Sequence, residues 1–507
     1  MKAVITAQTM RRCEETNFAA GTADALELMH IAGKGCFEVF RKFMAAQGFF
    51  RRVVIFAGSG NNGGDGVVIA DFFARQENYE VVLALAGEKS KLSPAGAFYL
   101  AKLSEKVSVC SADDVNLQDG DCIIEALLGT GCCAPMREPY RSLIDKINTA
   151  ALPVLSVDLP AGLGSDVCVK AELTAVIGYF KDTLFTADGI ENSGALRLVD
   201  LPLVILPETA PDTPECSSLQ WFRKSTAVLP RNVHKYQRGT VLVAGGSKSY
   251  IQAPFLTARS ALRSGAGLVK LAVPFAVEPG SGCLGIIPLQ TADKNGFFCR
   301  ESLNGELFSK VNAVAAGPGM GRNDSVIDAV TELLKSDLPL VLDADAIFAA
   351  GKLPWLLHKR SAVTILTPHR GEANILANNL KVELTGDNID DARQLARAAN
   401  AVVLLKGART VVAAPDGRCI INTTGSGALA TAGSGDTLTG IIAAELAAMH
   451  SAGAVDAAAA AARGAFLHGI AGELGALQWG SRGMIADDLP ELIARAENLI
   501  AKKGDIF

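Results

Sequence analysis

The chain has 507 residues, of which 49% are hydrophobic and 20% charged, and its net charge of −5 argues against a basic nucleic-acid-binding surface. This length exceeds what one hydrophobic core supports, so we expect at least two domains. The N-terminus has no long apolar stretch and the 11 cysteines have no metal-ligand spacing. We therefore expect a cytoplasmic protein that neither enters a membrane nor binds nucleic acid.

Four apolar runs in the first half of the chain each lead into a glycine: 53–58, 79–87, 121–129 and 153–162. Nearly continuous apolar runs are typical of parallel strands buried on both faces. Helix-like segments alternate with such runs in both halves, which predicts α/β domains with helices on both faces of each sheet. Ligands bind beyond the carboxyl ends of such strands, so the ends of the first, third and fourth runs are predicted to converge on one site.

The segment 205–218 contains three prolines, Pro207, Pro211 and Pro214, and no hydrophobic periodicity. Proline-rich segments of this kind are typical of linkers. We expect one domain over 1–212, a linker over 213–218, and a second domain over 219–507.

The sequence GSGNNGGDG at 58–66 follows the first predicted strand. Clustered glycines allow backbone N–H groups to converge on an anion at a helix N-terminus, so the motif fits a tight turn, a dinucleotide site, or another phosphate or ion site. Asn61, Asn62 and Asp65 add oxygens that suit a cation. Glu125 and Asp158 end neighbouring predicted strands, where each is a helix cap, a general base or an ion ligand.

The second half ends with the motif TAGSGDTLTG at 431–440, which opens a long apolar helix. Its glycines predict an anion-binding turn, and Asp436 is placed to take a proton from a hydroxyl that attacks a phosphoryl group. KGART at 406–410 supplies a cation for nucleotide phosphates or forms a surface turn. TPHRGE supplies His369, and DADA supplies Asp343 and Asp345, which are helix caps or hold magnesium through water.

These motifs resemble a known family in their order, GGS, GPGMG, DADA, TPHRGE, KGART and TAGSGDTLTG. Residues 219–507 resemble the ADP- or ATP-dependent NAD(P)H-hydrate dehydratases, which have a ribokinase-like fold. Residues 1–212, with GSGNNGGDG, EALLGTG and VDLPAG, resemble the NAD(P)H-hydrate epimerases, which have a Rossmann-like three-layer αβα fold. Both together resemble the bacterial bifunctional nicotinamide nucleotide repair enzymes.

The resemblance implies that the first domain interconverts the R and S hydrates, NADHX or NADPHX, and that the second dehydrates the S form with ADP and Mg²⁺. It places the epimerase substrate at Asn61, Asn62, Gly63, Gly64, Asp65, Gly129, Thr130, Gly131, Pro135 and Asp158. It places the hydrate of the second domain at Ala253, Gly319, His369 and Asp436, and the nucleotide at Lys406, Gly407, Ala408, Arg409, Thr410 and Gly435. Asp436 and Asp158 are the implied catalytic residues, and K⁺ is implied at Asn62, Glu125 and Ala161.

The departures from the family pattern cluster in the first domain. Glu125 stands where the family usually has Asp, Ala161 where it has Ser, and 181–183 where it has Lys-Pro-Gly. An extra methylene moves a carboxylate by about 1 Å, which disturbs a site that needs set distances.

Three alternative functions remain at this point. One is a small-molecule kinase with a decayed nucleotide-binding first domain, the second is a first domain that serves only binding or assembly, and the third is a Rossmann oxidoreductase. The sequence has no further catalytic motif that would support an oxidoreductase. An Ala-rich helical face at 454–462 suits a homo-oligomer.

Overall fold

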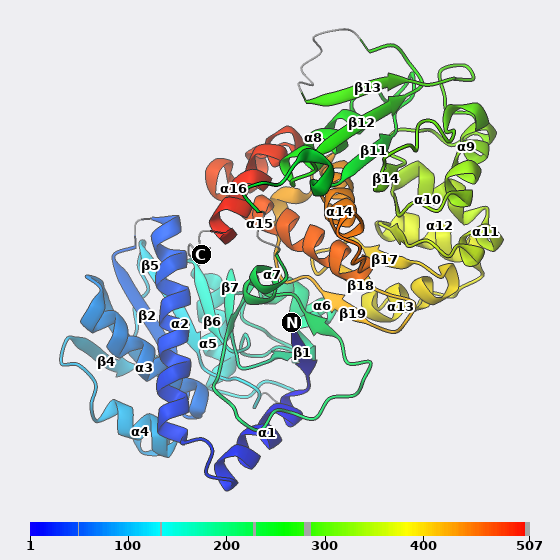
Figure 1. Cartoon of the computed structure of the whole chain (residues 1–507). Coiled ribbons are helices and arrows are strands. Elements are labelled where there is room, and N and C mark those ends of the chain that lie inside the picture. Colours follow the sequence, from blue (N-terminus) through cyan, green and yellow to red (C-terminus); the bar gives the residue numbers. More distant parts are fainter. Residues whose placement is uncertain (49, 132–133, 227–229, 278–284, 502–507) are drawn as a thin grey trace. The chain divides into compact units, whose positions relative to one another are not determined.

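The computed structural model describes residues 1–48, 50–131, 134–226, 230–277 and 285–501. The chain divides into two compact units, an N-terminal unit over Lys2–Thr213 and a C-terminal unit from Pro214 onward. Each is an α/β unit built on a mainly parallel sheet (Figure 1). The segment 213–218, expected as a linker, includes strand β10 (Glu215–Cys216), which pairs in parallel with β19 (Cys419–Ile421) and so belongs to the C-terminal sheet.

The N-terminal unit is built on a seven-stranded parallel sheet with helices on both faces. Val53 and Ile55 of β2 pack into one apolar layer with α2 and α3, whereas Val54 and Phe56 pack into the opposite layer with α5. The strand order is β4 (Val107–Ser111), β3 (Glu80–Leu85), β2 (Arg52–Ala57), β5 (Asp121–Ala126), β6 (Val154–Val157), β7 (Leu173–Ile177) and β9 (Ala195–Val199). The helices are α1 (Ala7–Ala19), α2 (Ala25–Gln47), α3 (Asn61–Gln76), α4 (Pro94–Leu100), α5 (Tyr140–Thr149) and α6 (Ala187–Asn192), and β1 (Lys2–Ile5) pairs with β8 (Phe180–Lys181).

The C-terminal unit repeats this layering around a larger sheet. Val314 and Ala316 of β14 pack into one apolar layer with α9, α10 and α12, and Ala313 and Ala315 pack into the other with α8, α14 and α15. The strand order is β13 (Ile286–Gln290), β12 (Leu268–Val273), β11 (Thr240–Ala244), β14 (Ala313–Ala316), β15 (Leu340–Leu342), β16 (Thr364–Leu366), β17 (Val402–Leu405), β18 (Val411–Ala413), β19 and β10. Strand β18 is antiparallel to β17 and β19.

The helices of the C-terminal unit cover both faces of this sheet. They are α7 (Leu219–Ser225), α8 (Ala253–Arg263), α9 (Asp324–Lys335), α10 (Ala344–Gly351), α11 (Pro354–Lys359), α12 (Arg370–Leu380), α13 (Asn388–Ala399), α14 (Ser434–Ser451), α15 (Ala457–Gly483) and α16 (Leu489–Ala501). Helices α8 and α14 pack closely at Gly440. A β-carbon at this position would lie only 2.2 Å from the Thr257 carbonyl oxygen. Glycine at this position therefore sets the distance between the two helices.

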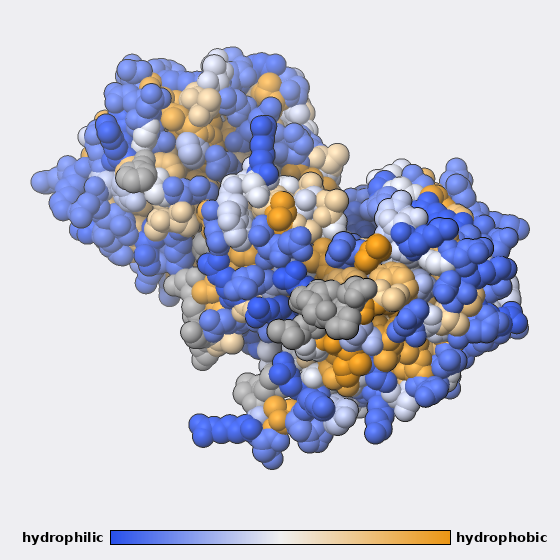
Figure 2. Space-filling model, turned by 90° about the horizontal axis from the view of Figure 1, so that it is seen from above, coloured by the Kyte–Doolittle hydropathy of each residue, from blue (hydrophilic) through white to orange (hydrophobic). Residues whose placement is uncertain are grey.

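Helix α15 carries most of the Ala-rich stretch and packs against α14 and α16. Across the described ranges, no helix combines the length and the apolar character that a membrane span requires. On the face seen in Figure 2, hydrophilic residues cover most of the surface and hydrophobic residues gather in separate patches.

Candidate functional sites

A glycine-rich turn joins β2 to α3 at the carboxyl edge of the N-terminal sheet. A β-carbon on Gly58 would lie 1.9 Å from the Leu127 carbonyl oxygen, and one on Gly63 would lie 1.8 Å from the Gly58 carbonyl oxygen, so the turn requires glycine at both positions. The side-chain amide of Asn62 is buried, and neither its oxygen nor its nitrogen has a hydrogen-bond partner within the described residues. Because an unsatisfied buried amide costs free energy, Asn62 points to a bound ligand.

Asp158 follows β6 and lies close to this turn. Its Oδ1 accepts a hydrogen bond from the Ile177 N–H at 3.1 Å and pairs with the buried ammonium of Lys181. Its Oδ2 lies 3.5 Å from the position of a β-carbon on Gly129, and the Asn62 β-carbon lies 3.6 Å from the same point. The ends of β2, β5 and β6 therefore converge on one site, as the sequence predicts. Lys181, which matches the Lys of the Lys-Pro-Gly pattern, also lies here through its ion pair with Asp158.

The other residues expected at this site differ in exposure. Asn61, Gly131 and Pro135 are exposed, whereas Gly64 is buried. The Thr130 carbonyl accepts a hydrogen bond from Arg11 of α1 at 2.8 Å.

Asp65 is buried in the first turns of α3. Burial raises the pKa of its carboxyl well above the usual range, and the charges of Asp158 and Glu14 raise it further.

Glu125 is fully buried at the end of β5, and its carboxylate is satisfied by the chain itself. Its Oε1 accepts a hydrogen bond from the Leu127 N–H at 2.7 Å, and its Oε2 accepts from the Ser156 hydroxyl at 3.0 Å and from the Ala161 N–H at 3.1 Å. Burial raises the pKa of Glu125 to about 7, against the lowering effect of these hydrogen bonds. The Ala161 methyl packs in an apolar layer, and the Ala161 carbonyl accepts a hydrogen bond from the Val169 N–H at 2.9 Å.

In the C-terminal unit, Asp436 lies half-buried in the first turn of α14. Burial raises the pKa of its carboxyl to about 7, the charge of Asp343 adds to this rise, and the ammonium of Lys406 opposes it. The first turn of a helix presents free N–H groups and a positive dipole end, which bind anions. The site thus combines a carboxylate that titrates near neutrality with a place for a phosphate.

Asp343 is the centre of a buried polar network beside this turn. Its Oδ1 accepts from Lys406 Nζ at 2.9 Å and from the Thr367 hydroxyl at 2.8 Å, and its Oδ2 accepts from the Thr439 hydroxyl at 2.9 Å. Asp343 occupies the N-cap position of α10, as one of the two interpretations expects, but its side chain is turned into this network and makes no capping bond to the helix. Lys406 Nζ lies 3.3 Å from the position of a β-carbon on Gly435, so the predicted nucleotide-binding residues Lys406 and Gly435 are adjacent.

The remaining predicted nucleotide contacts lie in the turn between β17 and β18. Gly407 and Ala408 are exposed, Arg409 is buried, and the Thr410 hydroxyl donates to the Gly407 carbonyl at 3.0 Å.

The side chains of His369 and Asp345 both accept hydrogen bonds from nearby protein groups. His369 Nδ1 accepts from the N–H groups of Gly371 and Glu372 at 3.0 and 3.3 Å, so His369 caps α12. Asp345 accepts from the Gly321 N–H at 2.8 Å and from Arg322 Nε at 2.9 Å. These contacts give both residues a structural role.

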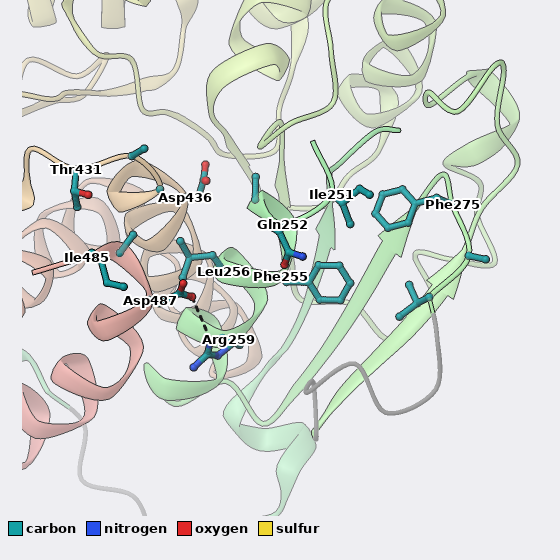
Figure 3. Close-up of a pocket in the computed structure, with 16 residues that line it drawn as sticks. Ile251, Gln252, Phe255, Leu256, Arg259, Phe275, Thr431, Asp436, Ile485 and Asp487 are labelled. Atoms are coloured by element: carbon teal, nitrogen blue, oxygen red, sulfur yellow. Dashed lines mark hydrogen bonds and ion pairs between the residues drawn. The ribbon is translucent and has the colours of Figure 1, made fainter. Parts of the chain in front are cut away.

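A cavity of about 830 Å³ opens beside Asp436 (Figure 3). Ala253 at the start of α8 and Asp436 both line it, and Gly319 lies next to it, because a β-carbon on Gly319 would be 3.5 Å from that of Ala253. His369 is not among the lining residues in the described part of the chain. Aromatic and aliphatic side chains form most of the cavity wall, and they include Ile251, Phe255, Leu256, Phe275 and Ile485. Arg259 and Asp487, which also line the cavity, form an ion pair at 3.5 Å. The size and mixed lining suit an organic ligand with charged groups.

Comparisons with known proteins agree with this division into two sites. Residues 241–495 match the family model described as NAD(P)H-hydrate dehydratase, and residues 25–183 match the model described as YjeF-related protein N-terminus. The bifunctional NAD(P)H-hydrate repair enzyme Nnr of Moorella thermoacetica is 33% identical over 97% of this chain and 96% of its own length. The enzyme of the same name from Salinibacter ruber is also 33% identical, over 97% of this chain and 95% of its own length.

Among solved structures, the ADP/ATP-dependent NAD(P)H-hydrate dehydratase of Bacillus subtilis, co-crystallised with ATP/Mg²⁺, is 29% identical, with a TM-score of 0.48, and covers 57% of this chain and 100% of its own. The family identification rests on the relatives that match over nearly the whole length and on the family models. The chain belongs to the family of bifunctional NAD(P)H-hydrate repair enzymes.

Proposed function

We propose that the chain repairs hydrated nicotinamide nucleotides in two reactions, one in each unit. The N-terminal unit interconverts the R and S hydrates, and the C-terminal unit converts the S hydrate to NAD(P)H with ADP, which yields AMP and phosphate. The observation that carries the proposal is Asp436, a half-buried carboxylate that lines a cavity of about 830 Å³ at the N-terminus of α14.

The dehydration needs a better leaving group than hydroxide, and phosphate is one. In this mechanism Asp436 takes the proton of the hydrate hydroxyl while that oxygen attacks the terminal phosphorus of the nucleotide. The N–H groups at the start of α14 and the ammonium of Lys406 stabilise the charge on the transferred group. The C–O bond then breaks and phosphate leaves with its electron pair, the neighbouring carbon loses a proton to water, and the ring double bond is restored. A pKa of about 7 suits Asp436 to act as a base at neutral pH.

Magnesium enters this reaction with the nucleotide. Within the described residues no group of three or more His, Cys, Asp or Glu side chains could hold a metal ion. Mg²⁺ commonly binds through nucleotide phosphates and water with few protein ligands, so the absence of such a cage suits a magnesium–nucleotide co-substrate.

The N-terminal site offers Asn62 and Asp158 to the hydrate. The Asn62 amide offers both N–H donors and a carbonyl acceptor, which suits an organic ligand that carries both kinds of group. A cation would satisfy only the amide oxygen and leave its nitrogen without a partner.

Potassium, which the resemblance implies here, does not fit Glu125 and Ala161 as they stand. Both carboxylate oxygens of Glu125 already accept hydrogen bonds from N–H or O–H groups. Ala161 has no side-chain oxygen, its methyl lies in an apolar layer, and its carbonyl is bonded to Val169. We therefore assign no step of the epimerisation to potassium.

A single assay tests both reactions. A mixed preparation of R- and S-NADHX is incubated with ADP and Mg²⁺, and the absorbance of reduced nicotinamide is followed. We expect a fast phase from the S hydrate and a second phase from the R hydrate that is faster than the spontaneous epimerisation of the hydrates, which is measured separately in a control without enzyme. Asp436→Ala abolishes both phases. Equal recovery with Asp436→Ala, or formation of a stable phosphorylated product in place of NADH, would contradict the proposal.

A further inference from the structure

Helix α1 contributes to the N-terminal site although it precedes the segment 25–183 that the family model matches. Arg11 of α1 donates to the carbonyl of Thr130 at 2.8 Å, which ties the helix to the loop that follows β5. Glu14 lies three residues further along, on the same side of the helix, and is half-buried. The next residue, Glu15, is exposed. The helix therefore presents one carboxyl group to the loop of the site.

Glu14 belongs to a cluster of charged groups drawn from separate elements. The cluster contains Asp65 of α3, Asp158 after β6 and Lys181 of β8, and Asp158 is ion-paired with Lys181. Burial raises the pKa of Glu14, the Lys181 ammonium lowers it, and the Asp158 carboxylate raises it again. The two carboxyl groups thus differ in their surroundings, because Asp158 is ion-paired with Lys181 whereas burial raises the pKa of Glu14, and such a difference suits an acid–base pair.

Glu14 differs from Asp65 in access. Asp65 is buried in the first turns of α3, whereas Glu14 is only half-buried and follows Arg11, which bonds to the Thr130 carbonyl, by one helical turn.

We infer that Glu14 is the general acid of the epimerisation and that Asp158 is its base, an inference that rests on the proposed epimerase function. Water adds to the nicotinamide ring at the carbon bonded to the ring nitrogen, because the nitrogen lone pair stabilises a cation there. Glu14 donates its proton to the hydroxyl on that carbon, the C–O bond breaks, water leaves, and the nitrogen lone pair forms a C=N bond. A water molecule then adds to the opposite face and gives its proton to Asp158. Proton exchange between the two carboxyl groups restores the starting state, so atoms and charge balance.

The two-phase NADHX assay tests this inference on the full chain. In Glu14→Gln we expect the second phase, from the R hydrate, to slow by about 10²–10⁴-fold, down to the rate without enzyme as its limit, because general acid catalysis contributes on this order. The fast phase should keep its wild-type rate and amplitude. Glu15→Gln, a matched change on the exposed side of the same helix, should leave both phases unchanged.

A second readout separates an acid from a structural role. The acid must be protonated, so the wild-type rate of the second phase falls as pH rises through the pKa of the acid. Glu14→Asp should keep this alkaline limb at a reduced rate, whereas Glu14→Gln should lack it, and both should unfold at the wild-type temperature.

Three outcomes of this assay would contradict either the assignment of Glu14 as the acid or the epimerase function. A Glu14→Gln second phase within about twofold of wild type, or one that keeps its alkaline limb, overturns the assignment. Loss of the second phase in Asp65→Asn but not in Glu14→Gln moves the acid to Asp65. A wild-type second phase no faster than the spontaneous epimerisation measured without enzyme instead refutes the epimerase function itself.

Discussion

Asp343 should control the pH dependence of the dehydratase, because its charge is one of the causes that raise the pKa of Asp436 to about 7. Asp343→Asn removes this charge and frees Lys406, whose positive charge lowers the pKa of Asp436. Glu372 and Asp345 also raise the pKa of Asp436, and burial, its largest cause, is unchanged. A neighbouring like charge shifts a pKa by about 1–3 units, and we take about one.

The sign and size of the effect follow from the ionised fraction of the base. With a pKa of about 7, the fraction of ionised Asp436 rises about tenfold between pH 6 and pH 8, and activity falls as the pH drops through 7. With a pKa near 6 in Asp343→Asn, the same fraction rises only about twofold. The variant should therefore lose most of its pH dependence over this range, whatever its absolute rate.

The assay measures kcat/KM for S-NADHX from pH 6 to pH 8.5 with ADP and Mg²⁺ in excess, and subtracts a blank without enzyme at each pH. The ratio of the values at pH 8 and pH 6 cancels any loss of rate caused by a displaced Lys406. A matched control is Asp345→Asn, a more distant charge whose removal should change the ratio less. An unchanged tenfold ratio in Asp343→Asn would refute the role of Asp343, and a flat wild-type profile would refute Asp436 as the base.

Two further predictions concern the two units separately. The second phase of the NADHX assay should keep its rate when K⁺ is replaced by Na⁺ at equal ionic strength, because Glu125 has no free oxygen for the ion; a loss of more than about tenfold on removal of K⁺ would contradict this. Gly440→Ala should lower the free energy of unfolding by about 1–3 kcal/mol in denaturant titrations, since its β-carbon would overlap the Thr257 carbonyl at 2.2 Å. Gly427→Ala, with open space around its β-carbon, is the control and should change stability by less than about 1 kcal/mol.

The sequence predicts the layered fold and the family well, for physical reasons. The runs at 53–58 and 121–129 form β2 and β5 because strands buried on both faces need continuous apolar residues. The family predicted from the order of the motifs is confirmed by relatives that match over nearly the whole chain. Strands such as β8 and β10 escaped prediction because two residues carry no periodicity.

The sequence predicts the partners of the site residues less well. The role of Asp343 depends on Thr439, which is 96 positions away, and the charge of Asp158 is balanced by Lys181, 23 positions away. Such contacts depend on how strands and helices are ordered in space, which no local pattern specifies. The departure at Glu125 was visible in the sequence, but not that its carboxylate turns back onto its own backbone.

The hydrogen bond from the Ala161 N–H to Glu125 links two of the positions at which this chain departs from its family pattern. Glu125 accepts hydrogen bonds from the N–H groups of both Leu127 and Ala161, and the Ala161 methyl lies in an apolar layer. A change at either position therefore alters the surroundings of the other. Residues taken from a relative at positions 125 and 161 should be tested singly and together, as a double-mutant cycle.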